Sequence, residues 1–309
     1  MDIVLLTSLD NIDFREWCEL TCSTKKCIDF CQNVGLIGFT LNEPCAQGHN
    51  NWKLGSCARA SDEFVWRCGK CKSTRTIRHG TFFSNSKLAI RQVLDLTYFW
   101  AQQIDSHAFL RRHCKFASES TIVDWKNFAR DLCGEHFSRH PVVIGGPGHI
   151  VEIDESAWTK KKYNRGRLVS NQWVFGGIDR DTRECFAVLV DQRDAATLLP
   201  IIHQYIRAGT TIYSDQWAAY NGIANGPGPD RYNHQTVNHS VNFVDPTTST
   251  HTQNIENLWM CMKRKKKNQM GQHVTLLGTH LTEYMWRQRF GDRPFENLVR
   301  AIQEKYVVQ

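Results

Sequence analysis

The sequence HTQNIENLWMCMKRKKK, residues 251–267, is the strongest indication of how the C-terminal half of the chain folds. Its apolar residues recur at the spacing of one helical face and predict an amphipathic helix that docks on a core. These residues are Ile255, Leu258, Trp259 and Met262. Glu256 lies beside the apolar stripe, and Lys263 falls about two turns further on, on roughly the same face. An acid in this place can take part in a catalytic or metal site only if other acidic side chains lie close to it.

The segments before and after this helix predict a mixed sheet. Alternating apolar and polar residues indicate three hairpin-linked strands, then a helix and two more strands. The predicted strands are 149–158, 171–178, 184–190, 210–214 and a segment near 235–243, and the predicted helices are 195–208, 276–289 and 295–305. This order predicts an α/β, ribonuclease H-like core with a mixed five-stranded sheet and flanking helices.

Two aspartates of the predicted sheet are candidates to join Glu256. Asp154 lies within the first strand, on the face that also carries Glu152, whereas Glu155 should point to the other side. Asp215 ends the fourth strand, which neighbours the first in a ribonuclease H-like sheet, so Asp154 and Asp215 should face each other. Any one acid is most often a surface carboxylate. Three that converge need a cation, and oxygen ligands suit two Mg²⁺ or Mn²⁺ ions.

A second metal site is predicted in residues 41–85. Cys68 and Cys71 form a CxxC knuckle after a short strand, which supplies two of the four ligands of a structural Zn²⁺. The other two come from Cys45 with His49, or from Cys45 with Cys57. The alternative is a reduced loop of unliganded thiols. The other early cysteines have helical spacing and are interpreted as small buried thiols rather than metal ligands; they are Cys18, Cys22, Cys27 and Cys31.

Segment boundaries follow from these patterns. Residues 86–140 predict three helices, the last capped by Ser118, and fit either a helix-turn-helix or a small bundle. We expect a helical segment (1–40), a zinc-ribbon-like segment (41–85), a helical segment (86–140), a catalytic core (149–290) and a C-terminal helix (291–309).

The net charge of +7 is only mildly basic, but many of the basic residues occur in clusters. Runs of this kind are usually solvated surface, but they also suit the DNA backbone, and the second run could serve as a nuclear-import signal. The candidate DNA contacts are Lys160, Lys161, Lys162, Arg165 and Arg167, and then Lys263, Arg264 and Lys265. The first residues lack a secretory-signal pattern, and no window is apolar enough to predict a membrane span.

Taken together, five pieces of the sequence resemble the Merlin superfamily of cut-and-paste DNA transposases and their bacterial ISXO2-like insertion-sequence relatives. They are WRCGKC (66–71) with TIRHGTFFSNSKL (76–88), VEIDES (151–156), WVFGGIDRDT (173–182), YSDQWAAY (213–220) and the stretch 251–267. The resemblance implies a zinc ribbon and helical DNA-binding region before a DDE integrase-type core. It implies Asp154, Asp215 and Glu256 as the catalytic triad and Lys263 as a phosphate contact.

The sequence departs from the family at two places. The family's first zinc half is usually a second CxxC, so His49 or Cys57 would have to substitute here. The interval between Asp215 and Glu256 is slightly long, and some relatives carry Asn or His in the third position, which keeps Asn254 and His251 as alternatives.

The resemblance implies a function on double-stranded DNA. That function is metal-dependent phosphodiester hydrolysis and strand transfer at transposon terminal inverted repeats, by a protein that could be a homo-oligomer. The protein would be nuclear in a eukaryote and cytoplasmic otherwise. The alternatives are a domesticated DNA-binding protein without catalysis and a ribonuclease H-like nuclease.

Overall fold

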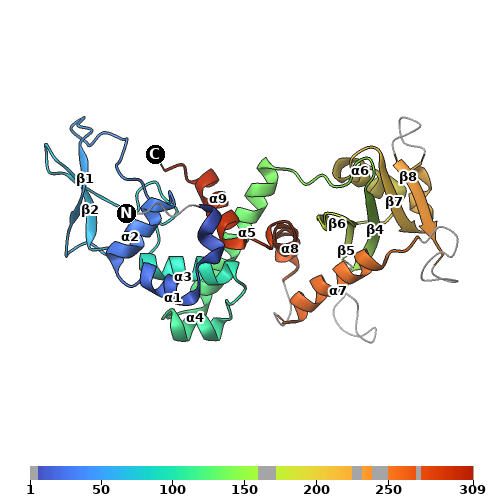
Figure 1. The fold of residues 1–309 in the computed structure, drawn as a ribbon, viewed down its shortest axis with the longest axis horizontal. Helices are drawn as coiled ribbons and strands as arrows, with labels where there is room; N and C mark the ends of the chain where they lie inside the picture. Colours follow the sequence, from blue (N-terminus) through green and yellow to red (C-terminus); the bar gives the residue numbers. More distant parts are fainter. Residues whose placement is uncertain (1–5, 159–171, 225–231, 239–249, 269–272, 309) are drawn as a thin grey trace. The chain divides into compact units, whose positions relative to one another are not determined.

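The computed structural model describes residues 6–158, 172–224, 232–238, 250–268 and 273–308. The chain divides into two compact units, one of residues 1–136 with 292–309 and one of residues 137–291 (Figure 1). Within the described ranges, no helix is long and apolar enough to cross a membrane. The predicted DNA contacts from Lys160 to Arg167 lie outside the described residues.

The first unit combines a small antiparallel sheet with helices. Its strands are β1 (Trp52–Ser56), β2 (Phe64–Cys68) and β3 (Thr74–Thr76), paired in the order β1-β2-β3. Its helices are η1 (Leu6–Asn11), α1 (Phe14–Leu20), α2 (Thr24–Asn33), α3 (Ile90–Ala101), α4 (His107–His113), α5 (Glu119–Arg139, of which the last three residues fall in the second unit) and α9 (Pro294–Lys305). Capping explains several helix starts, since Asp13, Ser23 and Ser106 accept backbone N–H groups at α1, α2 and α4.

The C-terminal helix α9 belongs to this first unit. The Asp10 carboxylate accepts hydrogen bonds from the backbone N–H groups of Phe295 and Glu296, both at 2.9 Å. The Gln303 amide donates to the Val34 carbonyl at 2.8 Å. Residues from the two ends of the sequence therefore share one core, which a segment-by-segment division of the sequence did not anticipate.

The second unit contains a five-stranded sheet with the order β6-β5-β4-β7-β8. Strands β4, β5 and β6 pair antiparallel, and β4–β7 and β7–β8 pair parallel. The strands are β4 (Ile150–Ala157), β5 (Trp173–Asp179), β6 (Cys185–Val190), β7 (Thr210–Asp215) and β8 (Tyr232–Val237). The predicted mixed five-stranded sheet is confirmed, and its strand order is that of a ribonuclease H-like core. The fifth strand begins earlier than predicted.

Helices cover both faces of this sheet. They are α6 (Ala195–Tyr205), η2 (Ala218–Gly222), α7 (Gln253–Asn268), η3 (Val274–Leu276) and α8 (Leu277–Phe290). Helix α6 packs on one face, where the Tyr205 ring stacks on Phe186 with centroids 4.8 Å apart. Helix α7 lies on the other face, against β4 and β5 (Figure 1). The predicted apolar stripe of α7 is fully buried in the core, so it is this stripe that docks the helix.

Candidate active site and thiol cluster

The pairing of β4 with β7 brings Asp154 and Asp215 together. The parallel register places Val151 opposite Ile212 and Glu152 opposite Tyr213. Carried on by two residues, the same register sets Asp154 opposite Asp215, and both side chains fall on the α7 face because side chains alternate along a strand. The extended register thus aligns the two predicted aspartates, and the negative charge of Asp215 is near enough to contribute to raising the pKa of Asp154.

Asp154 lies in an environment that disfavours its charge. Burial raises the pKa of Asp154 to about 7, and the negative charges of Glu155 and Asp215 add to this effect. The Trp259 indole N–H donates to Asp154 Oδ2 at 3.0 Å and works in the opposite direction. A cation at this position would supply the missing positive charge, so the donor set fits a hard divalent metal ion.

Trp259 can reach Asp154 because the residue opposite Asp154 on β5 is a glycine. Gly176 is the register partner of Asp154. A Cβ at Gly176 would lie 2.7 Å from the Trp259 ring and 2.6 Å from the Phe186 carbonyl oxygen, too close for either contact. The absence of a side chain at Gly176 thus allows α7 to approach the sheet closely enough for this hydrogen bond.

Glu256 lies in the first turn of α7, one turn before Trp259 and on the same side of the helix. It is exposed, and its Oε1 lies 3.4 Å from the Thr252 hydroxyl. Three groups among the described residues have metal-ligand atoms all within 4.8 Å of one another, and Asp154, Asp215 and Glu256 do not form one of them. A two-metal site does not require that closeness, because the outer acids bind different ions.

The start of α7 is fixed by Glu152, which is completely buried. Its Oε2 accepts the backbone N–H groups of Asn254 at 2.8 Å and Ile255 at 3.0 Å. Its Oε1 accepts the Asn254 side-chain amide at 2.7 Å and Arg180 Nε at 2.6 Å. We call these contacts the Glu152 clamp. His251 Nδ1 also lies 3.6 Å from Glu152 Oε1, so the two alternative third ligands, Asn254 and His251, both contact Glu152.

Glu155 and Asp179, two other acids of the sheet, have different environments. The Tyr220 hydroxyl donates to Glu155 Oε1 at 2.6 Å, and burial raises the pKa of Glu155. Asp179 ends β5 and accepts the N–H groups of Asp181 and Thr182, as a turn residue does.

The basic residues of α7 differ in their contacts. Lys263 Nζ donates to the Ser156 hydroxyl at 2.5 Å, two positions beyond Asp154 on the same strand. Lys265 Nζ donates to the buried Glu283 at 2.7 Å, so its charge is used inside the unit. Arg264 is exposed.

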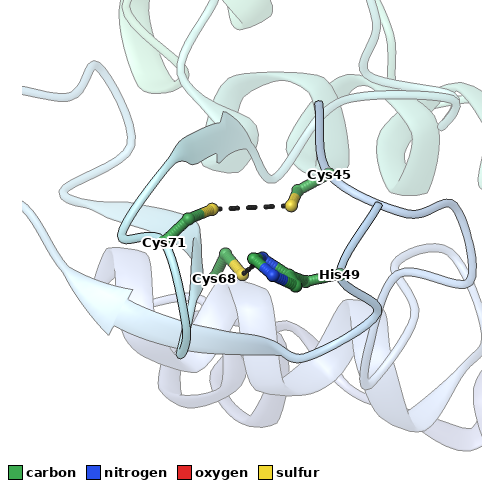
Figure 2. A group of neighbouring side chains, drawn as sticks. All are labelled: Cys45, His49, Cys68 and Cys71. Carbon is green, nitrogen blue, oxygen red and sulfur yellow. Dashed lines mark hydrogen bonds between the residues drawn. The ribbon is translucent and has the colours of Figure 1, made fainter. Parts of the chain in front are cut away.

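A thiol cluster lies in the first unit. The ligand atoms of Cys45, His49, Cys68 and Cys71 all lie within 4.8 Å of one another (Figure 2). Two hydrogen-bonded turns present them: Gly48 N–H donates to the Cys45 carbonyl at 2.7 Å, and Lys72 N–H donates to that of Cys68 at 3.0 Å. This set corresponds to the first predicted ligand combination, and Cys57 is not among the four residues.

The distances within the thiol cluster are compatible with zinc. The sulfurs of Cys45 and Cys71 are 3.5 Å apart. A tetrahedral site with Zn–S bonds of about 2.3 Å separates two sulfurs by about 3.8 Å. The pKa of Cys71 is lowered to about 7, chiefly by its contact with the Ser73 hydroxyl, which favours the thiolate that a metal requires.

Comparison with known proteins supports a transposase family. Residues 146–290, which contain all three candidate acids, match the ISXO2-like transposase domain. The chain is 26% identical over 102 residues to an uncharacterized transposase-like protein of Haemophilus influenzae, covering 33% of this chain and 78% of that one. The match concerns DDE transposases generally, and the Merlin superfamily in particular is not confirmed.

A longer alignment joins the chain to male abnormal protein mab-31 of Caenorhabditis elegans. The two are 24% identical over 285 residues, which is 82% of this chain. The chain spans 62% of the length of that relative.

Among solved structures, the catalytic core domain of HTLV-2 integrase in complex with magnesium is 14% identical and has a TM-score of 0.30, covering 46% of this chain and 85% of that chain. A simian T-cell lymphotropic virus intasome structure is 16% identical and has a TM-score of 0.31, covering 62% and 67%. The fold assignment rests on the strand order above and not on these two structures.

Proposed function

We propose that the protein is a DNA transposase that hydrolyses a phosphodiester bond at transposon ends and transfers the freed 3′ end to target DNA. The observation that supports this proposal is the parallel register of β4 and β7, which, continued by two residues, aligns Asp154 with Asp215 within the segment that matches a transposase domain. Neither acid alone would support an activity, but a paired set on adjacent strands of a ribonuclease H-like sheet does.

Each acid has a role in this proposal. Asp154, central on β4, would hold both Mg²⁺ or Mn²⁺ ions, while Asp215 and Glu256 would each complete one site. Bound ions of this kind activate the attacking oxygen and stabilise the leaving one. The protein's own contribution is positioning: Trp259 orients the Asp154 carboxylate, and the Glu152 clamp fixes the helix that carries Glu256.

DNA binding follows from the same surface. Lys263 and the exposed Arg264 extend along α7 beyond Glu256, where they would contact the phosphate backbone. The thiol cluster would hold one structural Zn²⁺, and the small unit around it would contribute to recognition of the DNA ends. Pairing of two transposon ends would require at least a dimer, which we include in the proposal.

The test is cleavage and joining of duplexes that carry the terminal repeats flanking the gene, with Mg²⁺ or Mn²⁺. We expect Asp154→Asn, Asp215→Asn and Glu256→Gln to abolish both steps while DNA binding persists. Asp191→Asn is the matched control, since this acid is exposed outside the site. If Asp154→Asn cleaves as fast as the unmodified protein, the assignment fails.

The same assay separates the alternatives. Binding without any nicking would identify a domesticated DNA-binding protein. Cleavage without joining would identify a nuclease of the same fold.

A further inference from the structure

An open hollow lies next to the candidate active site, at the carboxyl end of β7. Its volume is about 500 Å³, and it is lined by residues 192–194 before α6, by Ala195 at the start of α6, and by residues 217–219 after Asp215. Nothing in the proposed roles of the three acids uses this hollow. Its walls come from the turn into α6, the first residue of α6 and the start of η2, and none of its lining residues belongs to α7.

One arginine and one tryptophan of the lining lie close together, and the same arginine contacts a second tryptophan outside the hollow. The Arg193 guanidinium lies 3.8 Å from the ring centroid of Trp173 and 5.3 Å from that of Trp217. Trp217 remains 42% exposed, although burial of so large an aromatic ring is strongly favourable. An indole left open beside a guanidinium is therefore a surface available to a flat ligand.

Trp217 is held rigidly in spite of its exposure. Its backbone N–H donates to Asp215 Oδ1 at 2.9 Å, and its indole N–H donates to the Arg193 carbonyl at 3.1 Å. One hydrogen bond thus fixes the backbone of Trp217 and a second fixes its ring, which lowers the entropy lost when a ligand stacks on the ring. Asp194, the acid among the lining residues, is turned toward α6, where it accepts the Thr197 N–H at 2.9 Å.

We propose that the Trp217 indole stacks on an unpaired nucleobase of the DNA strand whose phosphate lies at Asp154 and Asp215, with Arg193 holding the indole in place. This inference rests on the proposed function. Two residues of chain span at most about 7 Å, and neighbouring nucleotides in a stacked strand are about 3.4 Å apart. A base within one or two nucleotides of the reacting phosphate therefore reaches this ring. Indole–base stacking is strong and tolerates every base.

The experiment compares two DNA substrates with the full-length protein. One is a blunt duplex, and the other has the same sequence with three unpaired nucleotides at one end, carrying 2-aminopurine. We expect Trp217→Ala to weaken binding of the unpaired end by about 5- to 150-fold. Binding of the blunt duplex should change less than twofold. Trp217→Phe should retain most of the affinity, and Leu189→Ala, which removes an exposed apolar side chain elsewhere (38% exposed), should bind both substrates normally.

Two results would overturn the stacking proposal: equal binding of the unpaired end by Trp217→Ala and the unmodified protein, or equal losses on both substrates. If Trp217→Ala fails to fold, Trp217→Phe decides, because loss of binding with an intact fold contradicts a stacking role. The outcomes for the two proposals are separable. Selective loss by Trp217→Ala in a protein that never cleaves DNA would support the base site and reject the transposase activity.

Discussion

Replacement of Glu283 by Gln is the substitution whose effect on the free energy of unfolding follows most directly from the structure. Glu283 lies on α8, is 3% exposed and accepts hydrogen bonds from Lys265 Nζ and Arg287 Nε, both at 2.7 Å. Burial alone would raise the pKa of Glu283. The two cations outweigh burial and lower the pKa from its ordinary value of 4.5 to about 2.

This pKa shift converts into a pH-dependent stability. The folded state lowers the pKa of Glu283, so the ionised carboxylate stabilises the fold above pH 4.5, and this contribution is lost as the pH falls toward 2. At neutral pH the contribution is about 3 kcal/mol. Glu283→Gln should remove it and lower the melting temperature by about 6–12 °C. Near pH 2 the variant and the unmodified protein should differ much less.

The assay is thermal unfolding of the full chain by calorimetry between pH 2 and pH 7. Glu184→Gln is the control, because Glu184 pairs with Arg289 at 3.0 Å but is 28% exposed, and it should change stability by less than about 1 kcal/mol. A Glu283→Gln variant as stable as the control at pH 7 would refute the argument. So would a deficit that stays the same at pH 2.

Two further predictions concern packing and metal. Gly176→Ala should destabilise the sheet unit by about 1–3 kcal/mol and lower the rate of DNA cleavage, because the new Cβ displaces Trp259 from Asp154. Gly278→Ala is the control, because its Cβ would meet only a side-chain atom 3.9 Å away. Unfolding and cleavage assays should show neither effect in this control. Metal analysis should find about one zinc per chain, lost in Cys68→Ser and retained in Cys57→Ser. Zinc in neither protein, or equal loss in both, would remove the assignment of the thiol cluster.

The sequence predicted the mixed five-stranded sheet, because alternation and element order are local patterns, and the facing of Asp154 and Asp215 is a prediction that rests on the same patterns. Alternation assigns Asp154 to one face of its strand, and the order of elements then fixes its neighbour. Trp259 was interpreted only as core, although its indole N–H contacts Asp154. A 3.6-residue period reports which face is buried, but it cannot report a polar edge on a buried ring.

Contacts between distant residues were the part that the sequence could not supply. The sequence pattern places Glu152 on the face of Asp154 but assigns it no partner, since its partners on α7 lie about a hundred positions away. Lys265 was grouped with its basic neighbours because its partner Glu283 belongs to a different helix. The choice between His49 and Cys57 likewise depended on which turn faces the CxxC knuckle, a three-dimensional fact that spacing leaves open.

The Glu152 clamp has a consequence for the length of the chain between the second and third acids. A helix whose first turn is bonded directly to the central strand takes its position from that strand and not from the connection that leads into it. Closure of a longer loop costs little additional free energy. The interval between Asp215 and Glu256 can therefore gain or lose residues while Glu256 keeps its position relative to the strand that carries Asp154.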